Sequence, residues 1–219
     1  MTLKERYRLT IEYFSKTMPE PETELDYKNP FELLVAVILS AQCTDKRVNM
    51  ITPSLIAAYP DATALSGATP AEVYEYIKSC TYPNNKSKHL VGMAKMVVER
   101  FNGIIPDNPE KLQQLPGVGR KTANVVASVF FHKPLMAVDT HVFRVAKRIG
   151  LAEKAKTPLK TELILTKNIP EEMVRHVHHW LILHGRYICK ARNPLCSDCG
   201  ISGFCRYFEK MKSGNQTDK

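Results

Sequence analysis

The sequence predicts an all-α fold, and two observations support that prediction. Three helix starts share one signature, a capping residue followed by a proline, at Asn29-Pro30, Thr69-Pro70 and Asn108-Pro109. An Asn or Thr side chain accepts hydrogen bonds from the first turn of a helix, and proline is tolerated there because the N–H groups of that turn have no intrahelical acceptor. Few segments alternate apolar and polar residues with a period of two, so strand signals are weak.

The helices expected from these signals leave one clear break and one irregular segment. Residues 1–20 form an amphipathic pattern that ends at Pro19 and Pro21, where we expect a boundary between two lobes. Residues 31–39 are apolar on almost every side, which indicates a buried central helix. Residues 189–205 show little regular pattern, and the polar tail 212–219 is expected to be disordered. Further helices are expected over residues 70–80, 86–101, 120–131 and 170–187, and from residue 139 onward.

The chain carries an excess of positive charge. Of its 219 residues, 31 are Lys or Arg and 22 are Asp or Glu, for a formal net charge of +9. That excess favours a polyanionic partner, most commonly nucleic acid, although charge alone fits a merely basic protein equally well. No apolar run is long enough to span a membrane, and the N-terminus has no apolar signal core. We therefore expect an intracellular, cytoplasmic protein with no membrane partner, whose thiols stay reduced.

Four of the six cysteines occur together, at Cys189, Cys196, Cys199 and Cys205. Four thiols so close in sequence, in a reducing compartment, indicate a metal centre. A four-cysteine zinc site and a [4Fe–4S] cluster both use four thiolates, and the uneven spacing alone supports the two about equally. The remaining two, Cys43 and Cys80, have no partner at ligand spacing and are expected to be ordinary buried thiols.

A basic loop lies between the first two of these cysteines. It contains Lys190 and Arg192, follows closely on Arg186, and includes no acidic residue. The loop is either an ordinary solvated segment or, held rigidly by a metal site, a surface that presents its cations to a phosphate backbone. We favour the second interpretation and predict that Arg186, Lys190 and Arg192 contact nucleic acid.

The hairpin segment, residues 115–126, carries the strongest single binding signal. Two glycines flank a valine at Gly117, Val118 and Gly119, and a helical pattern opens directly afterwards with Arg120 and Lys121. Glycine lets a backbone approach a ligand closely, and the N–H groups at a helix start bind anions, most often phosphate. Lys121 is then either a phosphate clamp or a nucleophile, and the residues of the hairpin segment alone leave both roles open.

Four motifs taken together resemble the endonuclease III family of helix-hairpin-helix DNA glycosylase/apurinic-apyrimidinic lyases. They are the hairpin segment, the sequence VDTHVFRV at 138–145, the sequence HHWLILHGRY at 178–187, and the four-cysteine spacing. The likeness covers roughly residues 5–210 in order and without a large insertion, so it is more specific than any single motif.

The resemblance implies a two-lobed helix-hairpin-helix DNA glycosylase fold. Residues 22–133 would form a six-helix barrel lobe that contains the hairpin, and residues 1–21 with 134–211 would form an iron–sulfur cluster lobe. The cofactor implied by the family is a [4Fe–4S] cluster rather than zinc, with the four clustered cysteines as its ligands.

The resemblance also implies roles for individual residues. Lys121 matches the nucleophilic lysine of the family, and Asp139 matches its carboxylate. Gln42 matches the residue that enters the space left by a flipped base. In the family, the loop opposite that of Gln42 usually has the sequence glycine, apolar residue, tyrosine, whereas this chain has Thr-Tyr-Pro at 81–83. Here Tyr82 would act as the wedge by stacking.

These expectations combine into one predicted function. The chain would be a base-excision DNA repair enzyme that acts as a monomer on damaged or abasic sites in double-stranded DNA, and it would be nucleoid-associated only through that DNA. It would remove oxidised pyrimidines and then cleave the abasic site by β-elimination through a lysine Schiff base. Two alternatives are a monofunctional glycosylase of the same fold and a non-catalytic helix-hairpin-helix DNA-binding module with a structural metal.

Overall fold

The computed structural model describes residues 1–214, and in that range every regular element is helical. This confirms the predicted all-α class. The chain forms two compact units, one from Thr23 to Lys133 and the other from Met1–Glu22 together with the chain from Pro134 onward. No helix among the described residues is both long and apolar enough to cross a membrane.

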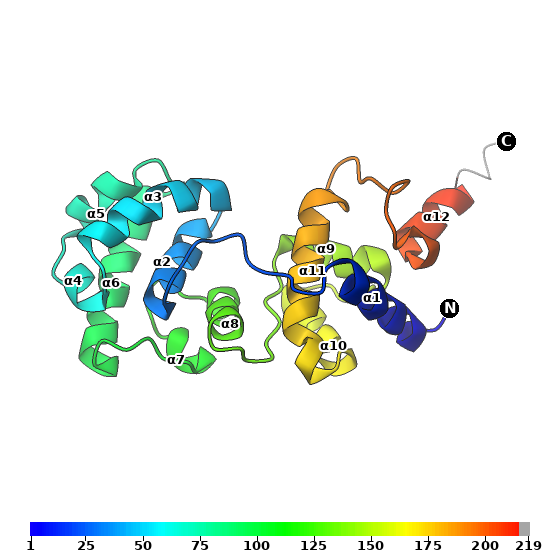
Figure 1. The fold of residues 1–219 in the computed structure, drawn as a ribbon, viewed down its shortest axis with the longest axis horizontal. Coiled ribbons are helices and arrows are strands. Elements are labelled where there is room, and N and C mark those ends of the chain that lie inside the picture. Colours follow the sequence, from blue (N-terminus) through cyan, green and yellow to red (C-terminus); the bar gives the residue numbers. More distant parts are fainter. Residues whose placement is uncertain (215–219) are drawn as a thin grey trace. The chain divides into compact units, whose positions relative to one another are not determined.

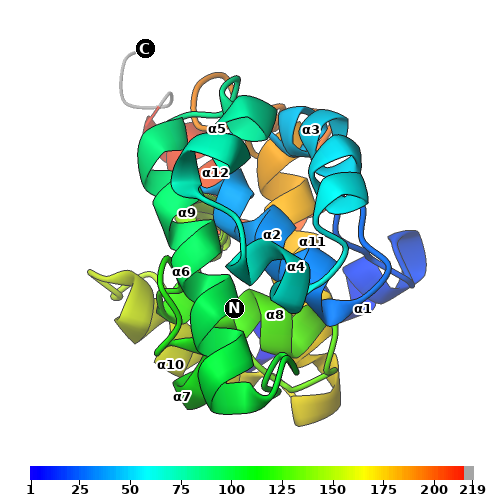
Figure 2. The ribbon, with the colours of Figure 1, turned by 90° about the vertical axis from the view of Figure 1, so that its left-hand side faces the viewer.

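The unit Thr23–Lys133 is built around one buried helix (Figures 1 and 2). Its elements are α2 (Pro30–Ser40), α3 (Asp45–Ala58), α4 (Ala62–Ser66), α5 (Pro70–Ile77), α6 (Pro83–Phe101), α7 (Pro109–Leu112) and α8 (Arg120–Val129). Helix α2 packs against α3, α6 and α8, and every residue from Leu33 to Leu39 is buried. The apolar run at 31–39 is therefore the central helix that its pattern predicts.

The three capped helix starts are confirmed. The Asn29 side chain accepts a hydrogen bond from the backbone N–H of Glu32 at 2.9 Å. Thr69 and Glu72 form a reciprocal capping box, because the Thr69 hydroxyl accepts from the Glu72 N–H at 3.3 Å and the Glu72 carboxylate accepts from the Thr69 N–H at 2.7 Å. Asn108 caps only the single turn of α7.

The second unit combines the N-terminal helix with the last third of the chain. Its elements are α1 (Leu3–Thr17), α9 (Thr140–Ile149), α10 (Pro158–Asn168), the 3₁₀ turn η1 (Glu171–Met173), α11 (Val174–Tyr187), the 3₁₀ turn η2 (Ser202–Phe204) and α12 (Arg206–Gly214). Trp180 of α11 is fully buried, stacks on Phe14 of α1 with 5.7 Å between ring centroids, and donates its indole N–H to the Met18 carbonyl at 2.7 Å. One aromatic cluster thus fixes α1 against a helix far from it in sequence.

Several expected element ends differ from the structure. The helices expected over 70–80, 86–101 and 120–131 span 70–77, 83–101 and 120–129 instead. The pattern at 170–187 begins as a 3₁₀ turn and becomes α-helical only at Val174. The expected disordered tail at 212–219 overlaps α12, so that Lys212 to Gly214 are helical, and residues 215–219 lie outside the described part of the chain.

Candidate functional site

The hairpin segment is anchored from below by apolar side chains and exposes its tip. Leu115 and Val118 are buried, and the Val118 N–H donates to the Leu115 carbonyl at 3.0 Å, which closes the turn. Gly119 is the N-cap of α8, and Arg120 is the first helical residue. Lys121 follows in the first turn with its side chain exposed to solvent. The arrangement presents the start of a helix, whose dipole favours an anion, beside an exposed amine.

The two glycines of the hairpin segment differ in their surroundings. Gly117 has φ +78°, and a Cβ there would lie 2.8 Å from the Cβ of His89, so both the backbone angle and the space exclude a side chain. Gly119 has an ordinary extended backbone, with φ −87° and ψ 176°. A Cβ at Gly119 would meet nothing within 4 Å. The fold therefore explains Gly117, whereas the open space at Gly119 leaves room for the close approach of an external group.

Asp139 caps another helix. Its Oδ1 accepts a hydrogen bond from the Val142 N–H at 2.8 Å, and α9 begins at the next residue, Thr140. The capping bond fixes the orientation of the carboxylate, and its second oxygen has no bond to this helix start. Lys121 belongs to the unit Thr23–Lys133 and Asp139 to the other unit.

The structure brings the loops of Gln42 and Tyr82 together. Both side chains are exposed, and both residues have left-handed backbone angles, with φ 55° and φ 56°. The Thr81 hydroxyl donates to the Gln42 carbonyl at 2.8 Å, which joins the two loops directly. Non-glycine residues seldom adopt such angles, and where they do the strain is typical of functional loops.

A buried lysine supports the same pair of loops. Lys86 is only 5% exposed, and its ammonium donates to the carbonyls of Leu39 at 2.7 Å and Ala41 at 2.8 Å. Both carbonyls lie at the end of α2, just before Gln42. Sequence reasoning missed Lys86 because the polar segment around it has the composition of a solvated turn.

The four clustered cysteines line one pocket. Its walls also include Ile149, His184, Leu195, Tyr207 and Phe208, so the surroundings are mainly apolar. A single zinc ion needs its sulfur ligands about 2.3 Å away and hence close to one another. Four thiols that line one mainly apolar pocket are a donor set that suits either a zinc ion or a [4Fe–4S] cluster.

The environment of these thiols is consistent with metal ligation. Burial raises the pKa of the Cys199 and Cys205 thiols, as it does for Cys196, and the neighbouring cysteines raise it further. The raised pKa values of these three thiols oppose their ionisation, and an iron centre would remove that barrier because its positive charge stabilises the thiolates.

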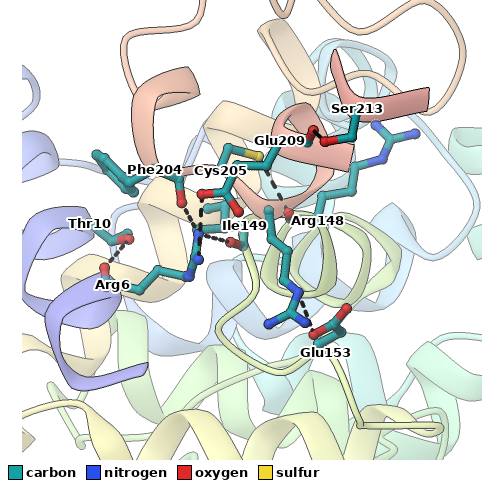
Figure 3. A network of polar contacts seen from close by, with 10 residues as sticks. Arg6, Thr10, Arg148, Ile149, Glu153, Phe204, Cys205, Glu209 and Ser213 are labelled. Carbon is teal, nitrogen blue, oxygen red and sulfur yellow. Dashed lines mark hydrogen bonds and ion pairs between the residues drawn. The ribbon is translucent and has the colours of Figure 1, made fainter. Parts of the chain in front are cut away.

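Two arginines of α9 hold in place the segment that carries the four cysteines, residues 189–205, called the cluster segment below. Arg148 donates to the Cys189 sulfur at 3.4 Å and to the carbonyls of Lys190 at 2.6 Å and Ala191 at 3.0 Å. The Cys205 thiol donates in turn to the Arg148 carbonyl at 3.4 Å (Figure 3). Arg144 donates to the Cys189 carbonyl at 3.2 Å. The basic loop is therefore fixed by hydrogen bonds to its backbone, and the side chains of Lys190 and Arg192 are exposed, whereas Arg186 is partly buried.

A third arginine ties the N-terminal helix to the same segment. Arg6 is 5% exposed and donates to the carbonyls of Ile149, at 3.1 Å, and Phe204, while its guanidinium lies 3.7 Å from the Glu209 carboxylate (Figure 3). Phe204 precedes the last of the four cysteines. Sequence reasoning missed Arg6 and Arg148 because their acceptors are backbone carbonyls far away in the chain, which leave no sequence signal.

Two protein-family models match the chain. Residues 35–171 match the HhH-GPD superfamily of base excision DNA repair proteins. Residues 189–205 match the iron–sulfur binding domain of endonuclease III, and this range runs from the first to the last of the four cysteines. The donor set and this match agree, so the predicted cofactor, a [4Fe–4S] cluster, is confirmed over zinc.

The chain is similar to endonuclease III proteins over nearly its whole length. Endonuclease III from Rickettsia conorii is 50% identical over 202 residues, which cover 92% of this chain and 96% of that protein. Endonuclease III from Escherichia coli (strain K12) is 44% identical over 193 residues, which cover 88% of this chain and 91% of that protein. A solved endonuclease III–DNA complex, described as a trapped covalent intermediate, superposes with a TM-score of 0.91 at 40% identity and covers 97% of this chain and 100% of its own.

Proposed function

The chain belongs to the endonuclease III family of the HhH-GPD superfamily, and from that premise we propose that it is a bifunctional glycosylase and lyase for oxidised pyrimidines in double-stranded DNA. Membership of this family makes the chain a base-excision DNA repair glycosylase. The finer proposal concerns the chemistry, in which Lys121 acts as the nucleophile and forms a Schiff base with the sugar.

One observation carries the proposal most directly. The related endonuclease III whose complex is described as a trapped covalent intermediate must supply a nucleophile to DNA. In this chain Lys121 presents an exposed amine at the first turn of α8, next to a glycine hairpin suited to hold a phosphate. An amine is the nucleophile that this reaction class needs, because only an amine forms an imine with the sugar carbon.

The proposed reaction proceeds in two stages. The Lys121 nitrogen bonds to C1′ of the sugar while the bond from C1′ to the damaged base breaks, and opening of the sugar ring gives a protonated imine. The imine withdraws electrons and acidifies C2′, so that loss of a C2′ proton expels the 3′ phosphate by β-elimination. Water then hydrolyses the imine and restores the free lysine.

The remaining predicted residues have roles in binding and positioning. The Asp139 carboxylate, oriented by its capping bond, acts as a general base and stabilises the cationic sugar. Gln42 and Tyr82 fill the space that a flipped nucleotide leaves, since their exposed side chains extend from two loops that are bonded together. The backbone of Gly117, Val118 and Gly119 binds phosphate.

The cluster segment contributes to binding rather than to bond cleavage. When bound, the iron–sulfur cluster supplies a covalent cross-link among four thiolates. Arg148 holds the loop of Lys190 and Arg192 against this segment through its hydrogen bonds to two backbone carbonyls of the loop. With Arg186, these side chains present positive charge to the DNA backbone.

Borohydride trapping tests the proposal. Wild-type protein is incubated with duplex DNA that contains an abasic site or thymine glycol, and borohydride reduces any imine to a stable adduct. We expect an adduct with wild type and with Lys111→Ala, which removes an exposed lysine from neighbouring α7, and none with Lys121→Ala. An adduct with Lys121→Ala would overturn the assignment of the nucleophile. Base release by wild type without any adduct would indicate a monofunctional glycosylase.

A further inference from the structure

Two thiols outside the cluster segment lie next to each other. The sulfurs of Cys43 and Cys80 are 3.7 Å apart, although the two residues are 37 positions apart in sequence. Both lie in the unit Thr23–Lys133, whereas the four cluster ligands lie in the other unit. The expectation that both are ordinary buried thiols is wrong for Cys43, which is partly exposed; Cys80 is 5% exposed.

The position of the pair connects it to the two loops of the proposed DNA interface. Cys43 directly follows Gln42, and Cys80 comes two residues before Tyr82. The thiols therefore lie at the bases of two loops that are already joined by the hydrogen bond from Thr81 to the Gln42 carbonyl. The hydrogen bonds that join these loops, including those made by Lys86, are reversible polar contacts.

We propose that Cys43 and Cys80 form an oxidisable thiol pair, whose intramolecular disulfide cross-links the loop of Gln42 to the loop of Tyr82. Formation of the disulfide does not depend on the proposed function, whereas its effect on the reaction with DNA rests on that function. The oxidant is a small-molecule disulfide of the glutathione class.

The two thiols have different parts in the reaction. Cys43 is the accessible one, so its thiolate attacks the small disulfide, forms a mixed disulfide and releases one small thiolate. Burial raises the pKa of Cys80 to about 11, while the charges of Lys86 and Arg47 act in the opposite direction. Cys80 therefore enters second. Its sulfur attacks the Cys43 sulfur, its proton passes to the departing small thiolate, and the second small thiol is released. Overall, two protein thiols lose two electrons and two protons, and the small disulfide becomes two thiols.

The cross-link restricts the freedom of the two loops. A disulfide needs its sulfurs about 2.05 Å apart, whereas they are 3.7 Å apart here, so a side chain must turn or a loop must shift before the bond forms. Misplacement of a positioning group by about 1 Å can cost as much as about 100-fold in rate. We expect the oxidised protein to act on damaged DNA with a kcat/KM lower by roughly ten-fold, and a reducing thiol to restore it.

Peptide mapping of the cluster-loaded full-length protein tests the site. The protein is treated anaerobically with glutathione disulfide, digested without reduction and analysed by mass spectrometry, while the visible absorption of the cluster is followed. We expect a linked peptide that joins Cys43 to Cys80 with the absorption unchanged. Cys80→Ser should instead retain a stable mixed disulfide on Cys43, and Cys43→Ser should leave Cys80 largely unmodified because Cys80 is buried.

The outcomes separate the site from its effect. A wild-type protein that accumulates the mixed disulfide on Cys43 without the linked peptide, or that remains unmodified at both positions, overturns the site. A linked protein with unchanged activity overturns the effect on DNA. An inactive reduced wild type counts against the proposed function and not against the cross-link, which is read by mass. The thermal transition of each serine variant confirms that it is folded.

Discussion

At the scale of single residues, the two hairpin glycines allow stability and binding to be separated. The same substitution, glycine to serine, is made at each. Gly117→Ser forces a side chain into φ +78° and against His89, which should cost roughly 1–3 kcal/mol of folding free energy. Gly119→Ser meets no neighbour within 4 Å and places a favourable N-cap residue at the start of α8, so the thermal transition should not fall.

Gly119→Ser should nevertheless weaken DNA binding by about ten-fold or more, because the added side chain occupies the space through which a phosphate approaches the backbone. Thermal melting and a DNA titration of the two variants check this pair of expectations. Undiminished affinity in Gly119→Ser would count against the hairpin as a phosphate site.

Substitutions of Asp139 can likewise separate its structural role from its proposed chemical role. Its Oδ1 caps α9 through the Val142 N–H, and asparagine caps a helix about as well as aspartate. Asp139→Asn should therefore keep the thermal transition of wild type and lower the single-turnover rate by roughly 100-fold or more. Asp139→Ala should lose the same activity and also about 1 kcal/mol of stability. Equal rates for wild type and Asp139→Asn would confine the residue to capping.

The residues that could be found from sequence are those whose chemistry is local. Gly117 and Lys121 lie within five consecutive residues, and the spacing of the four cysteines indicates a metal centre. Lys86 and Arg6 could not be found, because each is defined by backbone carbonyls that only the fold brings near. The Arg6 acceptors, Ile149 and Phe204, are 143 and 198 positions away. A basic side chain read from sequence is assigned to the surface, and only the structure shows that these two are buried.

At the scale of elements, helices were predictable where a cap and a proline mark them. Helix α10 carries that signature as well, at Thr157 and Pro158, and its N-cap bond is present; it was missed although its signal was there. Helix α4 is only Ala62–Ser66 and was also missed. A helix of one turn has too few residues for a periodic apolar face, so sequence periodicity cannot reveal it.

Helix α1 is expected to stabilise the cluster segment through Arg6. Arg6→Ala would leave the buried Ile149 carbonyl and the partly buried Phe204 carbonyl without this donor, a loss of about 2–4 kcal/mol that corresponds to a fall in Tm of roughly 5–10 °C. Arg8→Ala is the matched control on the same helix, because Arg8 is exposed and, in the described part of the chain, forms its ion pair with Glu12 of α1; its effect should stay below about 2 °C. Equal Tm values for the two variants would contradict the bracing role of Arg6.

At the scale of the whole molecule, the net charge of +9 and the local basic loop make different predictions about salt. If affinity for DNA came from net charge alone, removal of any two cations would have the same effect. If Lys190 and Arg192 contact individual phosphates, their removal alone should change the number of counterions released on binding. Both side chains are exposed on a loop whose backbone Arg148 holds, so the second case is the one that the structure supports.

The double variant Lys190→Ala with Arg192→Ala should therefore reduce the slope of log Kd against log salt concentration by about 1.8, since each phosphate contact contributes about 0.9. It should weaken binding to all sequences alike, because phosphate contacts carry no sequence information. Lys16→Ala with Lys167→Ala removes the same charge from exposed positions on α1 and α10 and should leave the slope unchanged. Equal slopes for the two double variants would show that net charge, and not the loop held by Arg148, governs the attraction to DNA.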